Sequence, residues 1–426
     1  MIALPNGIEM FEASLAVWKL GAVPLPLSHR LPRHEREMLV KLAEPALVVG
    51  VAPSDHPDLR CLPTGFEPDA GQRSVGPDRV SPSWKIITSG GSTGRPKLIV
   101  SGESGLIAAT AGAAMGMRRN GVVLVPGPLY HSAGFHWSWL ALFLGNHVVV
   151  LPKFGAIEAL QAIHTRRVDW TYLVPTMMSR ILRAVQAEPD RFDLTSLAMV
   201  WHMAAPCPDW LKQAWIDLVG ADKLMELYGG SEGIVGAIIS GNEWLEHRGS
   251  VGKPIGGQIR IVDDRGAELP AGDVGEIFMK PDHEVSARLV GAEQRERDGW
   301  KSIGDLGRVD ADGYLYISDR RVDMILSGGA NVYPAEVEAA LVEHPAVARA
   351  VVVGLPDEDL GQRVHAVVEA EGDLTVDELL AFLGDRLVRY KIPRSIRFVD
   401  TPLRDDADKV RRSQLRDQEI ALAQTE

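Results

Sequence analysis

The first half of the chain alternates short apolar runs with longer amphipathic stretches. The runs are bounded by glycine or proline, as in ALVVG at 46–50, VVLVPGP at 122–128, HVVVLP at 147–152 and WTYLVP at 170–175. Strands that alternate with helical patterns are typical of parallel sheets covered by helices, because a parallel strand pair needs a long crossover. We therefore expect an α/β fold.

The pattern of the sequence changes at about residue 250. Short segments follow, and the turn signals DRG at 264–266 and AGD at 271–273 separate them. This spacing indicates hairpins. We expect a small, mainly antiparallel module, similar to a β-barrel, over about 250–320.

A second change follows Arg320. Pro334 opens a helical pattern, and strand-like and helical segments then alternate towards the end of the chain. A chain of 426 residues is too long for one ordinary core. We expect a large domain over 1–320, with two parallel-type α/β subdomains plus the β-rich module, and a small mobile α+β domain over 321–426.

Composition narrows the class of partner. The chain has 45 basic and 57 acidic residues and a net charge of −12, which argues against a nucleic-acid partner because phosphate backbones favour basic surfaces. Cys61 and Cys207 are the only two cysteines, so the sequence has neither a disulfide framework nor metal-ligand spacing. A reducing, cytoplasmic setting is the expectation.

No segment of the sequence predicts membrane insertion or export. The longest apolar run, at 137–152, is interrupted by Gly145, Asn146 and His147 and is too short to span a bilayer. The N-terminus has acidic residues where a signal peptide has basic ones.

Residues 88–97, TSGGSTGRPK, have the composition of an anion-binding loop. Glycines let the backbone approach an anion, while the hydroxyls and Lys97 can donate hydrogen bonds to phosphate oxygens. In a nucleotide triphosphatase loop, Gly-Lys-Ser/Thr opens a helix. Here Pro96 precedes the lysine and strand-like LIV follows it. The sequence therefore predicts a phosphate loop that joins two strands.

Four further motifs follow this loop, and together they resemble the adenylate-forming enzymes, a family of acyl- and aryl-CoA ligases, peptide-synthetase adenylation domains and luciferases. The motifs are PLYHSAGF at 128–135, LYGGSEG at 227–233, GWKSIGDLGRVDADGYLYISDRRVDMILSGGANVYPAEVE at 299–338 and DKVRRSQLR at 408–416. The resemblance covers essentially the whole chain.

The resemblance implies a site for ATP. The loop would hold the phosphates, Tyr228 would pack beside the adenine, and Asp305 with Arg320 would bind the ribose. The residues implied to bind ATP are Thr88, Ser89, Gly90, Gly91, Ser92, Thr93, Gly94, Lys97, Ala204, Ala205, Tyr228, Gly229, Ser231, Asp305 and Arg320.

Three catalytic residues are implied as well. Glu232 resembles the family's magnesium-binding glutamate, since a hard cation held by a carboxylate and phosphate oxygens neutralises ATP. Lys409 resembles the lysine that enters from the small domain and stabilises charge at the α-phosphate. Lys97 of the loop completes the set. Asp408 stands where the family usually has glycine, and its carboxylate would compete for the Lys409 ammonium.

The resemblance also implies sites for the other substrates. The implied pocket for the carboxylic acid contains His131, Val174, Met203, Gly229 and Gly230. His131 fits a core histidine equally well. The implied passage for coenzyme A contains Ser327, Gly328 and Gly329, and the implied hinge of the small domain contains Arg321 and Val322, the latter in place of the usual aspartate or lysine.

The implied reaction has two halves. A carboxylate attacks the α-phosphate of Mg-ATP and gives an acyl-adenylate and pyrophosphate; the coenzyme A thiol then takes the acyl group and releases AMP. Small glycines, with the tryptophan and methionine content, favour an apolar or ring-containing acid. A carrier protein as acceptor and a non-catalytic nucleotide-binding homologue are the alternatives, and a homodimer stays open.

The opening segment, ALPNGIEMFEASLAVWKLGAVPLPLSHRLPRHEREMLV at 3–40, resembles one that the family reaches only after an earlier stretch of strands and helices. We therefore expect this polypeptide to lack an N-terminal portion of the first subdomain.

Overall fold

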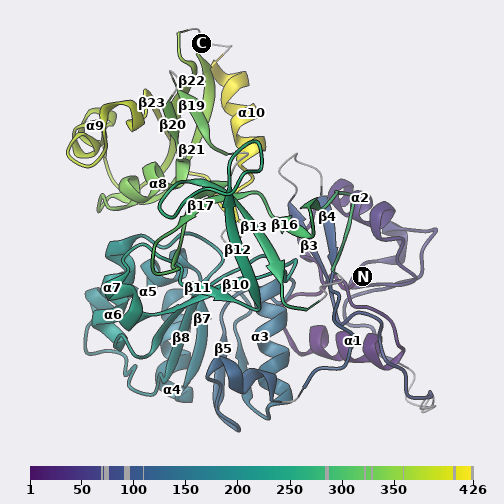
Figure 1. Ribbon diagram of the computed structural model, residues 1–426. Coiled ribbons are helices and arrows are strands. Elements are labelled where there is room, and N and C mark those ends of the chain that lie inside the picture. The colour runs from purple at the N-terminus through teal and green to yellow at the C-terminus, as the bar shows by residue number, and fades with distance from the viewer. Residues whose placement is uncertain are drawn as a thin grey trace.

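The computed structural model describes residues 1–68, 71, 76–90, 96–108, 110–283, 287–320, 323–327, 330–357, 359–405 and 409–423, and it leaves out the side chains of residues 89, 90, 96 and 320. The fold is α/β, as predicted, with a large N-terminal domain and a small C-terminal domain above it in Figure 1. Among the described helices, none has the length and apolar character needed to span a bilayer.

The large domain is centred on a seven-stranded sheet with the order β11-β10-β9-β8-β7-β5-β6. The strands β5 to β9 are parallel, while β10 and β11 run antiparallel at one edge. The apolar runs at 122–128, 147–152 and 170–175 form strands of this sheet, as predicted. The bounds are β5 Val122–Val125, β6 His147–Val150, β7 Trp170–Leu173, β8 Met199–Met203, β9 Leu224–Tyr228, β10 Gly236–Ser240 and β11 Lys253–Ile255.

Helices cover both faces of this sheet because the parallel strands are apolar on both sides. One layer buries a core that includes Leu160, Ile181 and Trp215 against the sheet, and the other buries Met10 and Trp137. The first layer contains α4 Ala156–Arg166, α5 Pro175–Ala187, α6 Asp209–Val219 and α7 Gly241–Glu246; the second contains α1 Ile8–Lys19, α3 Ser132–Phe143 and η2 Ala111–Met115.

Two smaller sheets lie in the N-terminal part. β1 and β2 form a short parallel pair, and β14 joins the antiparallel pair β3–β4. Whether the polypeptide lacks an earlier portion stays a prediction. The bounds are β1 Val48–Val49, β2 Cys61–Leu62, β3 Ile86–Gly90, β4 Pro96–Val100, β14 Arg288–Val290, α2 Arg33–Ala43 and η1 Pro53–Asp55.

The segment from about 250 onwards forms an antiparallel sheet, as the turn signals predicted. At the first turn, the Gly266 N–H donates to the Asp263 carbonyl over 3.0 Å, and Gly266 has a φ of +83° that favours glycine. The strands of this sheet are β12 Gly257–Val262, β13 Gly275–Pro281, β15 Arg295–Arg297, β16 Trp300–Ser302, β17 Asp305–Val309 and β18 Leu315–Arg320.

The small domain packs helices on both faces of a five-stranded sheet. The predicted helix begins at Pro334, and a capping box between Thr375 and Glu378 starts α9. The domain boundary at 320 stays a prediction. The bounds are β19 Ile325–Ser327, β20 Ala330–Val332, β21 Val347–Asp357, β22 Gly361–Ala370, β23 Ser395–Phe398, α8 Pro334–Val342, α9 Val376–Gly384, η3 Arg389–Lys391 and α10 Arg412–Ala423.

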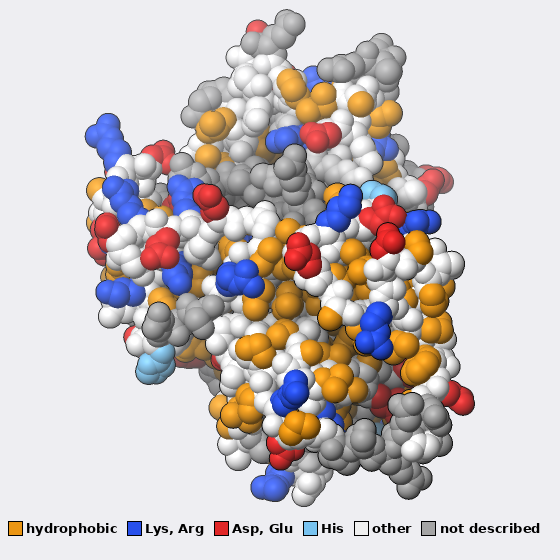
Figure 2. Space-filling view, turned by 90° about the vertical axis from the view of Figure 1, so that its right-hand side faces the viewer, with side chains coloured by type: hydrophobic (Ala, Val, Ile, Leu, Met, Phe, Trp, Pro, Cys, Tyr) orange, Lys and Arg blue, Asp and Glu red, His pale blue; other side chains and the backbone are white. Residues whose placement is uncertain are grey.

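The side of the molecule that carries α1 is partly apolar, and Figure 2 shows hydrophobic side chains gathered on the lower half of that side. Ile8 and Leu15 of α1, and Leu20 at its end, are exposed, whereas Met10 of the same helix is 1% exposed. Helix α1 therefore carries apolar side chains on its exposed face as well as on its buried face.

A buried ion pair links α6 to the central sheet. The Lys212 ammonium donates to the Glu226 carboxylate, and these residues are only 1% and 7% exposed. His202 of the neighbouring strand lies with Nε2 3.7 Å from the same carboxylate, and burial lowers its pKa to about 4, so its imidazole is neutral at pH 7. The pair therefore fixes α6 against the carboxyl ends of β8 and β9.

Removal of Lys212 tests this pair. Lys212→Met leaves the Glu226 carboxylate buried without its cation, and we expect the free energy of unfolding to fall by about 3–5 kcal/mol. Removal of the carboxylate too, in Lys212→Met with Glu226→Leu, should recover most of that loss. Urea unfolding measures both, with Lys41→Met, which removes an exposed lysine of α2, as the control. Equal effects of Lys212→Met and Lys41→Met would contradict this account.

Candidate active site

The predicted phosphate loop joins two antiparallel strands, which confirms the strand–loop–strand arrangement. β3 and β4 pair from Ile86 opposite Val100 to Gly90 opposite Pro96. Thr88 lies opposite Leu98, and Lys97, the second residue of β4, lies opposite Ser89. Gly91, Ser92, Thr93 and Gly94 lie outside the described residues, as does the side chain of Ser89.

Lys97 and Glu232 meet although 135 residues separate them. The Lys97 Nζ donates to Glu232 Oε1 over 2.9 Å, and the side chains are 22% and 9% exposed. Gly230 lies against this carboxylate, because a Cβ there would be 2.6 Å from Glu232 Oε2. The hairpin and the segment after β9 therefore form one wall of the site.

Tyr228 and Asp305 lie beside this wall. The Tyr228 hydroxyl donates to Asp305 Oδ2 over 2.7 Å, and Asp305 is 6% exposed. Asp305 also pairs across the β17–β18 ladder with Arg320, whose backbone alone is described. The structure thus brings together the three residues predicted to contact the adenine and ribose.

Ala204 and Ala205 follow β8, which is the strand next to β9 in the sheet. Ala204 is exposed and has a φ of +75°, a left-handed conformation that an alanine adopts at a cost of about 1 kcal/mol. Gly229 is exposed and Ser231 half-buried after β9. The predicted adenine-side residues therefore lie at the carboxyl ends of two adjacent parallel strands, where open α/β sheets bind their ligands.

His131 lies just before α3, at the same edge of the sheet. Burial, and then the charge of Lys409, lower the pKa of His131 to about 3, so the ring is neutral at ordinary pH. Its Nε2 atom is buried and has no hydrogen-bond partner among the described residues. The influence of Lys409 on His131 shows that the small domain holds its predicted catalytic lysine near the large domain's site.

Contacts between the domains support this placement. Arg411 of the small domain pairs with Glu35 of α2 at 2.8 and 3.0 Å. The Arg183 guanidinium of α5 donates to the Val347 carbonyl over 3.1 Å. These two contacts, at Arg411 and at Val347, join the small domain to the large domain.

Several predicted residues of the small domain lie outside the described part, namely Arg321, Val322, Gly328, Gly329 and Asp408. Ser327, at the end of β19, is 7% exposed. The hinge and the coenzyme A passage therefore stay predictions.

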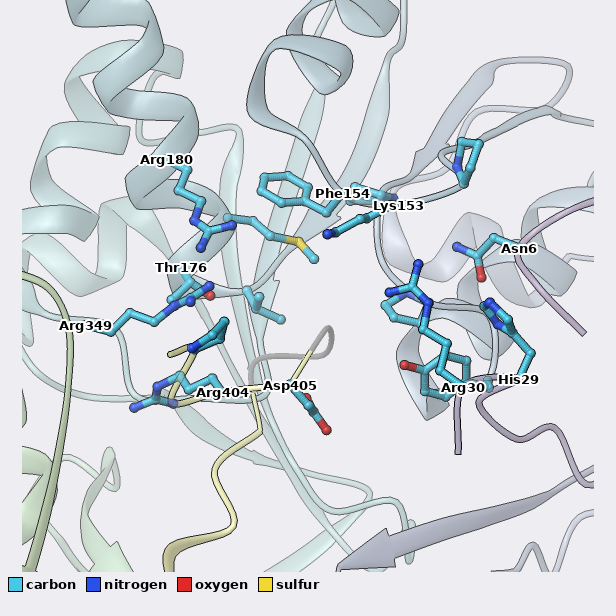
Figure 3. Close-up of a pocket in the computed structure, with 17 residues that line it drawn as sticks. Asn6, His29, Arg30, Lys153, Phe154, Thr176, Arg180, Arg349, Arg404 and Asp405 are labelled. Carbon is cyan, nitrogen blue, oxygen red and sulfur yellow. The ribbon is translucent and has the colours of Figure 1, made fainter. Parts of the chain in front are cut away.

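A basic cavity of about 170 Å³ lies between the domains. Figure 3 shows Arg180 of α5, with Arg349 and Arg404 of the small domain, on one side and Lys153 and Arg30 on the other. Asp405 is the only carboxylate among the described residues that line it, and Val174 lines it too. Sequence reasoning missed this cavity because its cations come from segments up to 374 residues apart, between Arg30 and Arg404.

Met203 belongs to the core and does not line this cavity. It is 7% exposed, and the Trp137 indole N–H donates to its sulfur over 3.3 Å. Its predicted place in the acid pocket, like that of Val174, stays a prediction.

Sequence reasoning also missed a buried lysine, Lys85, just before β3. It is 7% exposed, its Nζ donates to Ser132 Oγ at the start of α3 over 3.0 Å, and it lies 4.5 Å from the Trp84 ring centroid. Burial lowers its pKa to about 7. The only signal was one lysine inside the strand-like run WKIIT.

Comparison with known proteins gives the family. The model of the AMP-binding enzymes matches residues 1–285, and the model of the AMP-binding enzyme C-terminal domain matches residues 336–405. The chain belongs to the AMP-binding enzyme family. This confirms the resemblance to the adenylate-forming enzymes, and with it the enzyme class predicted from the motifs.

Curated relatives of this AMP-binding enzyme are ligases. A 2-succinylbenzoate–CoA ligase of Bacillus cereus (strain Q1) is 30% identical over 432 residues, which cover 97% of this chain and 87% of the relative. A 3-[(3aS,4S,7aS)-7a-methyl-1,5-dioxo-octahydro-1H-inden-4-yl]propanoyl:CoA ligase of Rhodococcus jostii (strain RHA1) is 32% identical over 363 residues. The match covers 83% of this chain and 68% of the relative.

Solved structures show the same fold. The o-succinylbenzoate CoA synthetase of Bacillus subtilis, in complex with the acyl-adenylate intermediate OSB-AMP, has a TM-score of 0.83 at 27% identity and covers 97% of this chain and 87% of that one. The amide bond synthetase McbA of Marinactinospora thermotolerans has a TM-score of 0.78 at 26% identity. The match covers 98% of this chain and 88% of that one.

The lowered pKa of Lys85 predicts a pH-dependent stability. Between the folded pKa of about 7 and the ordinary value of 10.5, the unfolded chain binds more protons than the folded chain. The free energy of unfolding therefore rises with pH through that window. Below the window, Lys85 adds no pH dependence. Lys85→Met removes this contribution. We expect the wild type to gain about 2 kcal/mol relative to the variant between about pH 6.5 and about pH 8.5.

Urea unfolding at both pH values measures this difference. Lys41→Met, which removes an exposed lysine, should show the same difference from the wild type at both values. A pH-independent difference for Lys85→Met would show that Lys85 is not held in an environment that disfavours its charge.

Proposed function

We propose that the chain is an ATP-dependent carboxylic acid:CoA ligase that acts through an acyl-adenylate. The observation that carries the proposal is the Lys97–Glu232 pair, 2.9 Å apart, next to the Tyr228–Asp305 hydrogen bond. A cation, a carboxylate and the polar side chains predicted to contact the base and the sugar meet at the carboxyl edge of a parallel sheet. This combination suits a magnesium nucleotide.

In the first half-reaction, a carboxylate oxygen of the acid forms a bond to the α-phosphorus of ATP, and the bond to pyrophosphate breaks. Lys97 and the loop after Thr88 would hold the phosphates by hydrogen bonds and charge. Lys409, which acts on the pKa of His131 from the small domain, would stabilise the charge that develops at the α-phosphate. The acid is itself the nucleophile, so no side-chain nucleophile is needed.

Magnesium fits the site through one carboxylate. Glu232 is 8% exposed and borders the Lys97 ammonium, and no group of three or more His, Cys, Asp or Glu residues within the described part of the chain could form a cage for a metal. Mg²⁺ is commonly held by one or two carboxylates with phosphate oxygens and water. Bound there, it would neutralise phosphate charge, and Glu232 would be its protein ligand.

The basic cavity supports coenzyme A as the acceptor. Its lining of Arg30, Lys153, Arg180, Arg349 and Arg404 contrasts with the chain's net charge of −12 and suits a substrate with several phosphates. The thiol would attack the acyl carbon, and AMP would leave. A carrier protein presents one phosphate, so it would use this lining less fully.

The small domain would turn between the two half-reactions about Arg321 and Val322. The Glu35–Arg411 pair would hold it in the orientation described above, with Lys409 near His131. That pair is half-exposed and therefore weak enough to break during the turn.

The substrate is proposed to be an apolar or ring-containing acid. The two relatives named above act on ring-containing acids, according to their names. Trp137 of α3 is buried, and its indole N–H donates to the sulfur of Met203, a predicted pocket residue, so it would give the pocket an apolar border.

Exchange of labelled pyrophosphate into ATP tests the function. We expect exchange with aryl or polycyclic acids but not with acetate, and a thioester detected by mass spectrometry once coenzyme A is added. Lys409→Ala should lower exchange by about 100-fold or more, because it removes charge stabilisation in the transition state. Arg389→Ala, which removes an exposed cation of the same domain, is the control.

Other outcomes separate the alternatives. Exchange without a coenzyme A thioester would favour another acceptor, such as a carrier protein. No exchange with any acid would favour a non-catalytic nucleotide-binding protein and would overturn the proposal.

A further inference from the structure

The Lys85–Ser132 pair has no place in the chemistry described so far. Lys85 immediately precedes β3, the strand that leads into the phosphate loop, and Ser132 follows His131 at the first turn of α3. The pair therefore connects the phosphate-loop strand to the segment that carries the predicted acid pocket.

Lys85 is a buried cation without a carboxylate close enough to form an ion pair. It is 7% exposed, and in the described part of the chain no carboxylate oxygen lies within 4 Å of its ammonium. Glu103 influences it only from a greater distance. The Trp84 ring, 4.5 Å away, supports the charge on one side. The positive potential of Lys85 is thus only partly neutralised within the protein.

The direction of the Ser132 hydroxyl follows from this contact. An ammonium group can only donate, so Ser132 Oγ accepts from Lys85 and its own proton must point elsewhere. No other described residue takes that proton, and Ser132 is half-buried, not enclosed. Ser132 therefore offers a hydrogen-bond donor that a neighbouring cation polarises.

The place of Ser132 in the sheet sets which part of a ligand it can meet. The strand order is β9-β8-β7-β5, and Ser132 follows β5 while Tyr228 ends β9. Three strand spacings of about 4.8 Å separate β5 from β9, or roughly 14 Å along the carboxyl edge. If a nucleotide binds beside Tyr228, the group that lies near Ser132 is therefore the far end of the acyl group.

We propose that Ser132, polarised by Lys85, is a specificity site that selects carboxylic acids with a second oxygen acceptor, a keto or carboxylate oxygen, on the acyl group remote from the reacting carboxylate. This inference rests on the proposed function, since it concerns the acid that the enzyme activates. A purely hydrocarbon acyl group would leave the Ser132 proton and the Lys85 charge without a partner, which is costly in a buried setting. The N-terminus of α3 adds positive potential of the same sign.

Matched acids in the pyrophosphate exchange assay test the proposal. The probes are 3-phenylpropanoates whose ring carries an isopropyl, an acetyl or a carboxylate group, groups of nearly equal size, at the ortho, meta or para position. For wild type we expect kcat/KM to be at least tenfold higher with an oxygen-bearing acid than with the isopropyl acid at one or more positions. Ser132→Ala should reduce that ratio at least fivefold, and Ser132→Thr, which keeps a hydroxyl, should retain most of it.

Lys85→Met provides an independent arm and separates the two oxygen acceptors. It should lower the preference for the carboxylate acid more than the preference for the acetyl acid, because the lost interaction is with charge. A ratio that is the same in wild type and Ser132→Ala, or a wild-type preference for isopropyl at all three positions, would overturn the inference and leave the proposed function standing. Absence of exchange with every acid would overturn both.

Discussion

The ion pair between Lys97 and Glu232 joins the phosphate-loop hairpin to the segment after β9, and the candidate site is built around it. Each of these charges would be costly if it were buried alone, so in the ligand-free chain each neutralises the other. A magnesium nucleotide offers each charge a new partner. The phosphate would pair with the Lys97 ammonium, and the magnesium ion would pair with the Glu232 carboxylate. On the proposed function, such an exchange of partners would let this site in an acidic chain bind a strongly anionic nucleotide.

Buried charges also organise the scaffold around this pair. Lys212 and Glu226 fix α6 against β8 and β9, the two strands whose ends carry Ala204 and Tyr228. Lys85 fixes the strand before the phosphate loop against α3. The left-handed Ala204 lies at one of these strand ends. A left-handed residue and a buried ion pair thus lie on the two strands whose ends carry predicted adenine-side residues, where ligand positions must be rigid.

The sequence predicted those features that depend on neighbouring residues. The hairpin of β3 and β4 follows from Pro96 and the strand-like segment after it, and the helix at Pro334 follows from its start signals. The order of the motifs identified the family before any contact was known. Such features depend on neighbouring residues or on a fixed order of motifs, and both kinds of feature can be detected in the sequence alone.

Contacts between distant segments were not predictable in the same way. The Arg411–Glu35 pair spans 376 residues, and the basic cavity draws its cations from both domains. Lys85 was not singled out in the sequence, because its burial and its contact with the Ser132 hydroxyl are properties of packing that leave no periodic signal. The roles of all the predicted site residues remain predictions from the motifs, and residues 91–94, 321–322 and 328–329 among them lie outside the described part of the chain.

The central claim is that the acid itself attacks the α-phosphorus of ATP. A ring-containing acid that supports exchange, labelled with ¹⁸O in its carboxylate, tests this directly when the AMP formed in the presence of coenzyme A is analysed by mass spectrometry. An acyl-adenylate predicts AMP that carries one carboxylate oxygen from the acid. Unlabelled AMP, or label found in inorganic phosphate, would contradict the account.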